Sequence, residues 1–335
     1  MKRIVFTCGD INGIGPEIAL KALNRITSRS KETQFILIIP ENIFTKASLL
    51  IRPRFSFQTV KDLLFNNIDS SQVIILTTNS FKQNIGKPTA SSGEAAYLAL
   101  KISFDLLNKN LADAVVTAPV SKTALKLAGV KYPGQTEMYA DWCGIKNFVM
   151  TFLSKKLRVA LYSIHIPLKE VSKSLILKAL STKLDTVISM LKIDLGINNP
   201  KIAVLGLNPH AGEGGIIGKE EKELIEPIIK LKNFRGVVDG PFSSDAFFAN
   251  RRFENFDLVF GLYHDQVLIP FKYINSGKGV NYSAGLPIIR TSPDHGTAYD
   301  IAGKGIADES SMIEAYKYAE LILKNRKKRL TTNEG

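Results

Sequence analysis

Three of the four histidines share one setting along the chain. His165, His210 and His264 each end, or closely follow, an apolar run typical of a buried strand, and we expect a loop after each. Because strand ends of a parallel sheet line its ligand crevice, three imidazoles there would suit Zn²⁺ or a similar divalent ion. Asp265 and Glu213 are candidates to orient these rings. The separations of the three histidines along the chain match no recognised ligand motif. The alternative is therefore that they are three unrelated loop histidines.

A second group of polar residues lies near the C-terminal end. Lys272, Asn281 and Arg290 precede a glycine-punctuated polar loop that leads into the last predicted helix. Cationic and amide groups in one region can hold carboxylate and phosphate. On composition alone, a solvated loop with ordinary surface cations explains them equally well.

The turn CGDINGIGPEI (8–18) follows the first predicted strand and opens a helix. Its glycines permit a close approach of the backbone, and Pro16 suits the first helical position. A phosphate or another anion could bind such a helix start. The turn matches neither of the common phosphate-binding glycine patterns, so a tight structural turn is the alternative. The chain also has no G-x-S-x-G motif, and nothing in it suggests covalent catalysis.

These groups must be positioned by alternating strands and helices. The predicted strands are 2–10, 34–40, 71–78, 112–120, 158–167, 201–210 and 256–266. The predicted helices are 16–23, 91–108, one from about 121, 168–191, 220–232 and 311–328. This alternation predicts an α/β fold with a mainly parallel sheet. Because no linker-like segment separates the halves, we expect two domains that share the sheet.

Composition and charge exclude several classes of protein. The net charge is +13, but the basic residues are spread along the chain, and their densest run, 324–329, fits the end of the last helix. A solvated basic surface that attracts anionic substrates is therefore favoured over nucleic-acid binding. Cys8 and Cys143 form no C-x-x-C pair and are interpreted as inert thiols. No apolar run is long enough to span a membrane, and we expect a cytoplasmic protein.

Segments along nearly the whole chain resemble the 4-hydroxythreonine-4-phosphate dehydrogenases of the vitamin B6 pathway. The matching stretches are GDINGIGPEI (9–18), DAVVTAPVSK (113–122), YPGQTE (132–137), HIPLKEV (165–171), NPHAGEGGIIGKEE (208–221), DGPFSSDAFF (239–248), YHDQVLIPFK (263–272) and GLPIIRTSPDHGTAYDIAGKG (285–305). The block DHGTAYDIAGKGIA (294–307) also resembles the adenosine-binding loop of isopropylmalate dehydrogenase.

The resemblance implies the isopropylmalate dehydrogenase-like fold, with two α/β/α domains around a mainly parallel central sheet. The first domain is expected over 1–125 plus 285–335 and contacts the cofactor. The second is expected over 126–284 and carries the metal and dimer contacts. The active site is expected in the cleft between them, at a homodimer interface, with metal ligands from both subunits.

The resemblance also assigns roles to individual residues. The metal ligands are His165, His210 and His264. The substrate-binding residues are Gln135, Thr136, Lys272, Asn281 and Arg290, and the cofactor-binding residues are His295, Gly296, Asp300 and Gly303. One position departs from the family, because its G-H-T-E pattern reads Gly-Gln-Thr-Glu here, with Gln135 in place of the histidine. An amide can hydrogen-bond the substrate, but it carries no charge near neutral pH.

The activity implied by the resemblance is the NAD- or NADP-dependent oxidation of 4-phosphooxy-L-threonine. The product, 2-amino-3-oxo-4-phosphooxybutanoate, loses CO₂ to give 3-amino-2-oxopropyl phosphate. One divalent ion per site, Zn, Mg or Co, is expected, and the general base is not identified. Because Gln135 replaces the family's histidine, the alternative is a paralogue that acts on threonate or erythronate 4-phosphate. A metal-dependent phosphohydrolase is a third possibility.

Overall fold

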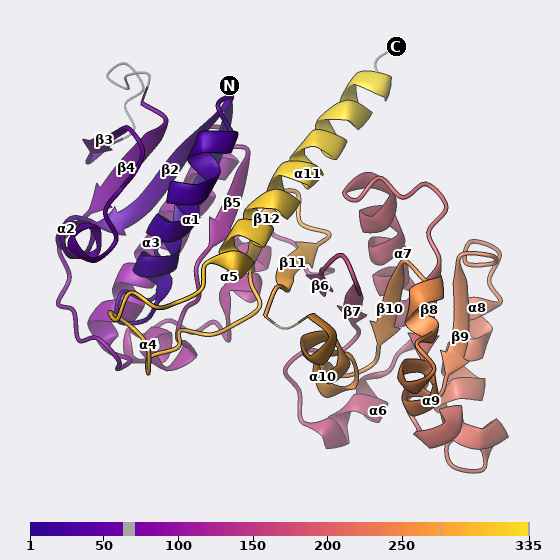
Figure 1. Cartoon of the computed structure of the whole chain (residues 1–335). Helices are drawn as coiled ribbons and strands as arrows, with labels where there is room; N and C mark the ends of the chain where they lie inside the picture. Colours follow the sequence, from indigo (N-terminus) through magenta and orange to yellow (C-terminus); the bar gives the residue numbers. More distant parts are fainter. Residues whose placement is uncertain (63–70, 276, 334–335) are drawn as a thin grey trace. The chain divides into compact units, whose positions relative to one another are not determined.

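The computed structural model describes residues 1–62, 71–275 and 277–333, which form two compact units (Figure 1). Unit 1 is Met1–Gly144 with Pro287–Leu323, and unit 2 is Ile145–Leu286 with Lys324–Gly335. This division departs from the expected boundaries at three places, one of which is a shift of only two residues, from 285 to 287. Residues 126–144 belong to unit 1, where Tyr139 packs its ring against Phe104 at a centroid distance of 6.4 Å. The chain from Lys324 onward belongs to unit 2, where Arg326 pairs with Asp194.

The sheet strands of unit 1 run parallel to one another. In spatial order they are β3 (Phe57–Val60), β4 (Val73–Thr78), β2 (Thr33–Pro40), β1 (Lys2–Thr7), β5 (Ala114–Thr117) and β12 (Arg290–Pro293). Every residue of β2 is buried, as expected for a parallel strand covered on both faces. β12 pairs Arg290 with Val115 of β5, which brings a late segment of the chain beside an early one.

Helices lie between or after these strands along the chain. They are α1 (Gly15–Ile26), α2 (Glu41–Leu50), α3 (Ala90–Asn108), α4 (Lys122–Leu127), α5 (Gln135–Trp142) and α11 (Ser310–Asn333), with a 3₁₀ turn at η1 (Thr27–Arg29). α1 begins with Pro16 in its first turn, as predicted. α3 begins at a reciprocal cap in which Thr89 and Ser92 exchange side-chain-to-backbone hydrogen bonds, which satisfies the free N–H groups of the first turn.

Unit 2 has a mixed sheet. Its strands, in spatial order, are β11 (Val280–Ala284), β6 (Val149–Leu153), β7 (Val159–Leu161), β10 (Leu258–Gly261), β8 (Ile202–Leu205) and β9 (Val238–Phe242). β6 is antiparallel to β11 and β7, whereas β7, β10, β8 and β9 are parallel. The strands and the helical segments packed on them build an aromatic-rich core, which includes Phe152 of β6 and, from the helical segments, Phe247, Phe253 and Phe271.

Two predicted helices of unit 2 are wrong in detail. The predicted helix 168–191 is three pieces, η3 (Leu168–Glu170), α6 (Val171–Ser174) and α7 (Leu177–Ile193), because Leu175 and Ile176 adopt extended backbone. The predicted helix 220–232 is a π-helical turn, η5 (Glu221–Ile225), followed by the short α8 (Glu226–Ile229).

Besides α2 and α5 of unit 1, three elements of unit 2 were also not predicted as helices. They are α9 (Ser244–Ala249), η6 (Arg252–Asn255) and α10 (His264–Asn275). The loop expected after His264 is therefore wrong, because His264 is the first residue of α10. The fold class itself is confirmed, since both units are α/β and their strands are mostly parallel.

Candidate active site

Arg290 is the centre of a buried polar cluster in unit 1. Its guanidinium donates to the hydroxyls of Thr117 at 3.1 Å, Thr136 at 3.0 Å and Ser292 at 3.0 Å, and to Oε1 of Gln135 at 3.1 Å. Arg290 and Ser292 lie on β12, Thr117 ends the neighbouring β5, and α5 begins with Gln135. The fold thus brings together three of the predicted substrate-binding residues, namely Gln135, Thr136 and Arg290.

The environment of Arg290 is unusual for a cation. The side chain is 3% exposed, and burial lowers its pKa from 12.5 to about 10, while Tyr139 and Glu137 act in the opposite direction. These hydrogen bonds to neutral oxygens orient the guanidinium, and the Glu137 carboxylate favours its charged form. An oriented guanidinium can bind a carboxylate or a phosphate.

Gln135 uses both ends of its amide within the protein. Oε1 accepts from Arg290, and Nε2 donates to the carbonyl of Ala118 at 3.1 Å. Each end retains capacity for one further hydrogen bond, since a primary amide has two donors and two acceptor positions. The predicted contact between Gln135 and the substrate stays a prediction, and the structure adds a role in orienting Arg290.

Two of the predicted metal ligands lie together in unit 2. His165 follows β7 and His264 follows β10, and these strands are parallel neighbours, so their carboxyl ends coincide. The ring centroids are 6.1 Å apart. Nδ1 of His264 lies 2.6 Å from Oδ1 of Asp265, a contact that fixes the ring and leaves Nε2 for a ligand. Asp265 thus has the orienting position suggested by the sequence.

His210 has a different setting. It lies after β8, in the segment η4 (Pro209–Gly215), with exposed side chain and left-handed backbone at φ 51°. The carboxylate of Asp245, in α9, is close enough to His210 for an electrostatic interaction. The pKa of Asp245 is lowered mainly by the hydrogen bond from Ser243, and His210 adds to this shift. The sequence alone did not single out Asp245.

Within the described part of a single chain, no three His, Cys, Asp or Glu side chains form a group that could hold a metal ion. The paired rings of His165 and His264 fit two positions of an imidazole-rich metal site. Completion of such a site requires a ligand from elsewhere. The joint assignment of the three histidines stays a prediction.

The remaining predicted substrate residues also lie in unit 2. Lys272 is exposed near the end of α10, about two turns after His264. Asn281 lies on β11 and is partly buried. Both stay predictions as substrate contacts.

The predicted cofactor residues lie on the irregular segment between β12 and α11 in unit 1. Gly296, Asp300 and Gly303 are exposed, and Nδ1 of His295 lies 3.1 Å from the carbonyl oxygen of Gly296. Gly303 has a left-handed backbone, φ 74°, which favours glycine. These residues offer an accessible polar surface, and their role with a cofactor stays a prediction.

The turn of residues 8–18 packs against this same segment. The N–H of Ile14 donates to the carbonyl of Thr297 at 3.0 Å, and a Cβ on Gly13 would lie 2.7 Å from that oxygen. Gly13 thus permits a close contact between two backbones. This geometry supports a tight structural turn. The backbone of Thr297 occupies the position at the helix start where the sequence suggested an anion.

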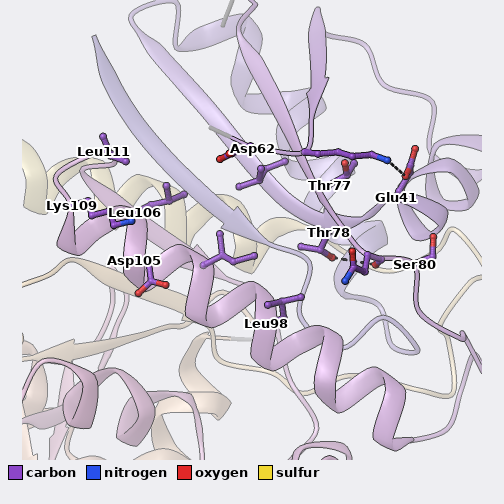
Figure 2. Close-up of a pocket in the computed structure, with 14 residues that line it drawn as sticks. Glu41, Asp62, Thr77, Thr78, Ser80, Leu98, Asp105, Leu106, Lys109 and Leu111 are labelled. Carbon is purple, nitrogen blue, oxygen red and sulfur yellow. Dashed lines mark hydrogen bonds and ion pairs between the residues drawn. The ribbon is translucent and has the colours of Figure 1, made fainter. Parts of the chain in front are cut away.

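Figure 2 shows a cavity of about 930 Å³ in unit 1. Its lining includes Glu41 at the start of α2, Thr77 and Thr78 at the end of β4, and Leu98 and Asp105 of α3. None of the predicted substrate, metal or cofactor residues lines it. The cavity therefore gives no support to the predicted site.

Comparison with known proteins decides the family. The model of the family described as "Pyridoxal phosphate biosynthetic protein PdxA" matches residues 31–319. The chain belongs to this family. A 4-hydroxythreonine-4-phosphate dehydrogenase of Bacteroides thetaiotaomicron is 38% identical over 330 residues, which cover 97% of this chain and 90% of the relative. The resemblance read from the sequence motifs is confirmed.

Solved structures agree with this assignment. The crystal structure of 4-hydroxythreonine-4-phosphate dehydrogenase from Klebsiella pneumoniae matches with a TM-score of 0.81 and 33% identity, over 96% of this chain and 98% of that one. Isocitrate dehydrogenase from Methylococcus capsulatus matches with a TM-score of 0.51 and 13% identity, covering 98% of this chain and 87% of that one. The second likeness shows a shared fold, as expected from the sequence. Among the described residues, no helix is long and apolar enough to cross a membrane.

Proposed function

We propose that this chain is a dehydrogenase that oxidises 4-phosphooxy-L-threonine with NAD⁺ or NADP⁺. The observation that carries the proposal is the buried Arg290, oriented by Gln135 and Thr136, in a chain whose relatives bear the name of this enzyme. Arg290 provides fixed positive charge for one anionic end of the substrate. Lys272 and Asn281 are proposed to hold other polar groups of the same molecule.

The proposed metal ligands are His165, His210 and His264. A bound divalent ion would lower the pKa of the substrate hydroxyl and withdraw electrons from the carbonyl during loss of CO₂. Asp265 holds Nδ1 of His264 and so presents Nε2 outward. The protein's contribution is to fix two imidazole rings at adjacent strand ends before the ligand arrives.

We propose that His210 is supplied by the second subunit of a homodimer. Large apolar side chains are exposed near all three histidines of unit 2, which is typical of a surface covered by a partner. They are Ile166 at 42%, Leu168 at 70%, Ile216 at 85%, Ile269 at 67% and Tyr273 at 87% exposure. A dimer through this surface would bury them and complete the metal site.

The dinucleotide is proposed to bind the 294–307 segment, with contacts from His295, Gly296, Asp300 and Gly303. When bound, the dinucleotide would supply the hydride acceptor, and the segment would hold it beside the substrate. The structural support is the accessible, glycine-containing backbone of this segment.

One assay separates the proposed activity from its rivals. The purified protein, supplied with a divalent ion, should produce NADH absorbance with 4-phosphooxy-L-threonine and release no inorganic phosphate. Faster turnover of threonate or erythronate 4-phosphate would assign the chain to a related substrate, which Gln135 keeps open. Phosphate release without NADH would indicate a phosphohydrolase and contradict the proposal.

A further inference from the structure

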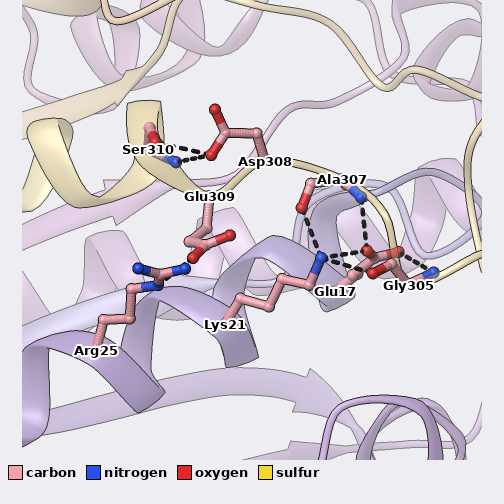
Figure 3. Close-up of polar contacts among 8 residues, drawn as sticks. All are labelled: Glu17, Lys21, Arg25, Gly305, Ala307, Asp308, Glu309 and Ser310. Atoms are coloured by element: carbon pink, nitrogen blue, oxygen red, sulfur yellow. Dashed lines mark hydrogen bonds and ion pairs between the residues drawn. The ribbon is translucent and has the colours of Figure 1, made fainter.

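Two charged residues of α1 form hydrogen bonds with the backbone of the segment between β12 and α11 (Figure 3). The Glu17 carboxylate accepts from the N–H of Gly305 at 3.2 Å and of Ala307 at 2.8 Å. Nζ of Lys21 donates to the carbonyls of the same two residues, at 2.9 and 2.7 Å. Glu17 and Lys21 also pair with each other at 2.9 Å. Four backbone groups of the segment are thus satisfied by one ion pair.

The ion pair is well shielded from solvent. The Glu17 side chain is 4% exposed and that of Lys21 is 18% exposed. Charge-assisted hydrogen bonds in such a setting are stronger than those at an open surface, and loss of one partner leaves the other charge poorly compensated. These hydrogen bonds to the segment therefore depend on the charges of both Glu17 and Lys21, and packing of α1 against the segment would not replace them.

The other part of the segment is tied to the 8–18 turn. The Tyr299 hydroxyl donates to Oδ2 of Asp10 at 2.7 Å, and the carbonyl of Thr297 accepts from Ile14 at 3.0 Å. Between these ties lie Asp300 and Gly303, which are exposed. The segment is consequently fixed on both sides of the exposed Asp300 and Gly303, as a preorganised ligand loop requires.

We propose that Glu17 and Lys21 are positioning residues for dinucleotide binding, which hold the 294–307 segment in its binding conformation. This inference rests on the proposed function, because that function assigns the segment to the cofactor. A segment released from the pair samples other conformations. The apparent cofactor affinity then falls in proportion to the fraction of molecules that remain competent.

Two variants and one matched control test the proposal. Glu17→Gln keeps the side-chain shape but removes the charge, and Lys21→Met removes the charge at the less buried position. Arg25→Gln is the control, because Arg25 is on the same helix and pairs with Glu309 at the far end of the same connection, yet is 72% exposed. The Glu309 side chain is 9% exposed, so this control removes the cationic partner of a shielded carboxylate, as Lys21→Met does, at a pair that involves Glu309 and not the 294–307 backbone.

The expected result is a split between cofactor and substrate parameters. Each test variant should weaken NAD⁺ binding, measured by calorimetry, and raise its KM by about tenfold, with kcat and the substrate KM within about twofold. Amide hydrogen exchange over 296–307 should accelerate in the free protein, while Arg25→Gln behaves as wild type. A purely structural role would lower the thermal midpoint without this split. If Glu17→Gln does not fold, Lys21→Met decides.

The failures are distinguishable. Folded variants that bind NAD⁺ as tightly as the wild type would overturn the role of Glu17 and Lys21 and leave the proposed function standing. A wild-type protein that neither binds nor reduces NAD⁺ or NADP⁺ would instead overturn the proposed function.

Discussion

At the scale of single residues, the contacts of Gln135 show how a neutral amide can stand at a position where the sequence resemblance implies a histidine. The amide accepts from Arg290 and donates to the carbonyl of Ala118. A neutral imidazole can do the same, with one ring nitrogen as acceptor and the other as donor. A protonated imidazole has two donors, and one of them would face the Arg290 guanidinium.

We therefore predict that Gln135→His keeps most of its activity above about pH 7.5 and loses it as the pH falls through the histidine pKa, ordinarily ~6.5. The nearby Arg290 should depress that pKa, so the loss should begin below this value. The measurement is kcat/KM against pH for both proteins. Profiles of the same shape in wild type and variant would show that residue 135 does not meet Arg290 in the working enzyme.

Asp265 allows a second prediction at this scale. Its carboxylate holds Nδ1 of His264, so Asp265→Asn should weaken metal affinity by about 10- to 100-fold, through loss of ring orientation and basicity. Affinity is measured by competition with a chelator. Glu213→Gln is the control, since Glu213 is also an exposed acid close in sequence to a predicted ligand. Equal losses in both variants would contradict a specific role for Asp265.

At the scale of elements, Asp10 joins three segments of unit 1. It accepts from Tyr299 at 2.7 Å, from the Ser92 hydroxyl at 3.3 Å and from the N–H of Asn12 at 2.8 Å. Burial nevertheless raises its pKa above the ordinary value of 3.8, against these hydrogen bonds. The folded state thus retains a proton that the unfolded chain releases.

The sign of the pH effect follows from this shift. The contribution of the raised pKa to stability is present below pH 3.8 and is lost as the pH rises through the folded pKa of Asp10. Asp10→Asn lacks this loss, so its free energy of unfolding should gain on that of wild type as the pH rises from about 4 through the raised pKa of Asp10. Urea unfolding at several pH values measures the difference.

The variant Tyr299→Phe provides a matched test of the same carboxyl group. It removes a hydrogen bond that lowers the pKa of Asp10, so the wild-type decline in stability should move to higher pH. A difference between Asp10→Asn and wild type that stays constant across the pH range would contradict this account of the buried carboxyl.

At the scale of the whole molecule, the proposed dimer predicts complementation between inactive chains. His210→Ala and His264→Ala should each abolish most activity when pure. If His210 completes a site built on the partner's His165 and His264, each mixed dimer has one intact site. Random mixing of equal amounts should then restore about a quarter of wild-type activity.

The control is a mixture of His165→Ala with His264→Ala. These two rings are neighbours in one chain, so every site in a mixed dimer lacks one of them, and no recovery is expected. Recovery in this control, or none in the first mixture, would contradict the proposed sharing of ligands. Metal content per dimer should follow activity in both mixtures.

The sequence by itself determined the fold class and the family. Apolar runs such as those of β2 and β10 alternate with amphipathic helices, and this local pattern is enough to indicate a parallel sheet. The ordered motifs along the chain identified the family, and the comparisons confirm it. Placement of His165 and His264 at strand ends also followed from local pattern, since neighbouring parallel strands end together.

Only the tertiary structure decided which distant residues meet. β12 lies beside β5 because of long-range pairing, and this places Arg290 against Thr117 and the start of α5. Likewise, nothing in the local sequence shows that Glu17 accepts a hydrogen bond from Gly305, which lies almost the whole chain away in sequence. The physical reason is that strand order and buried hydrogen bonds are set by global packing, whereas periodicity reports only the face that each segment buries.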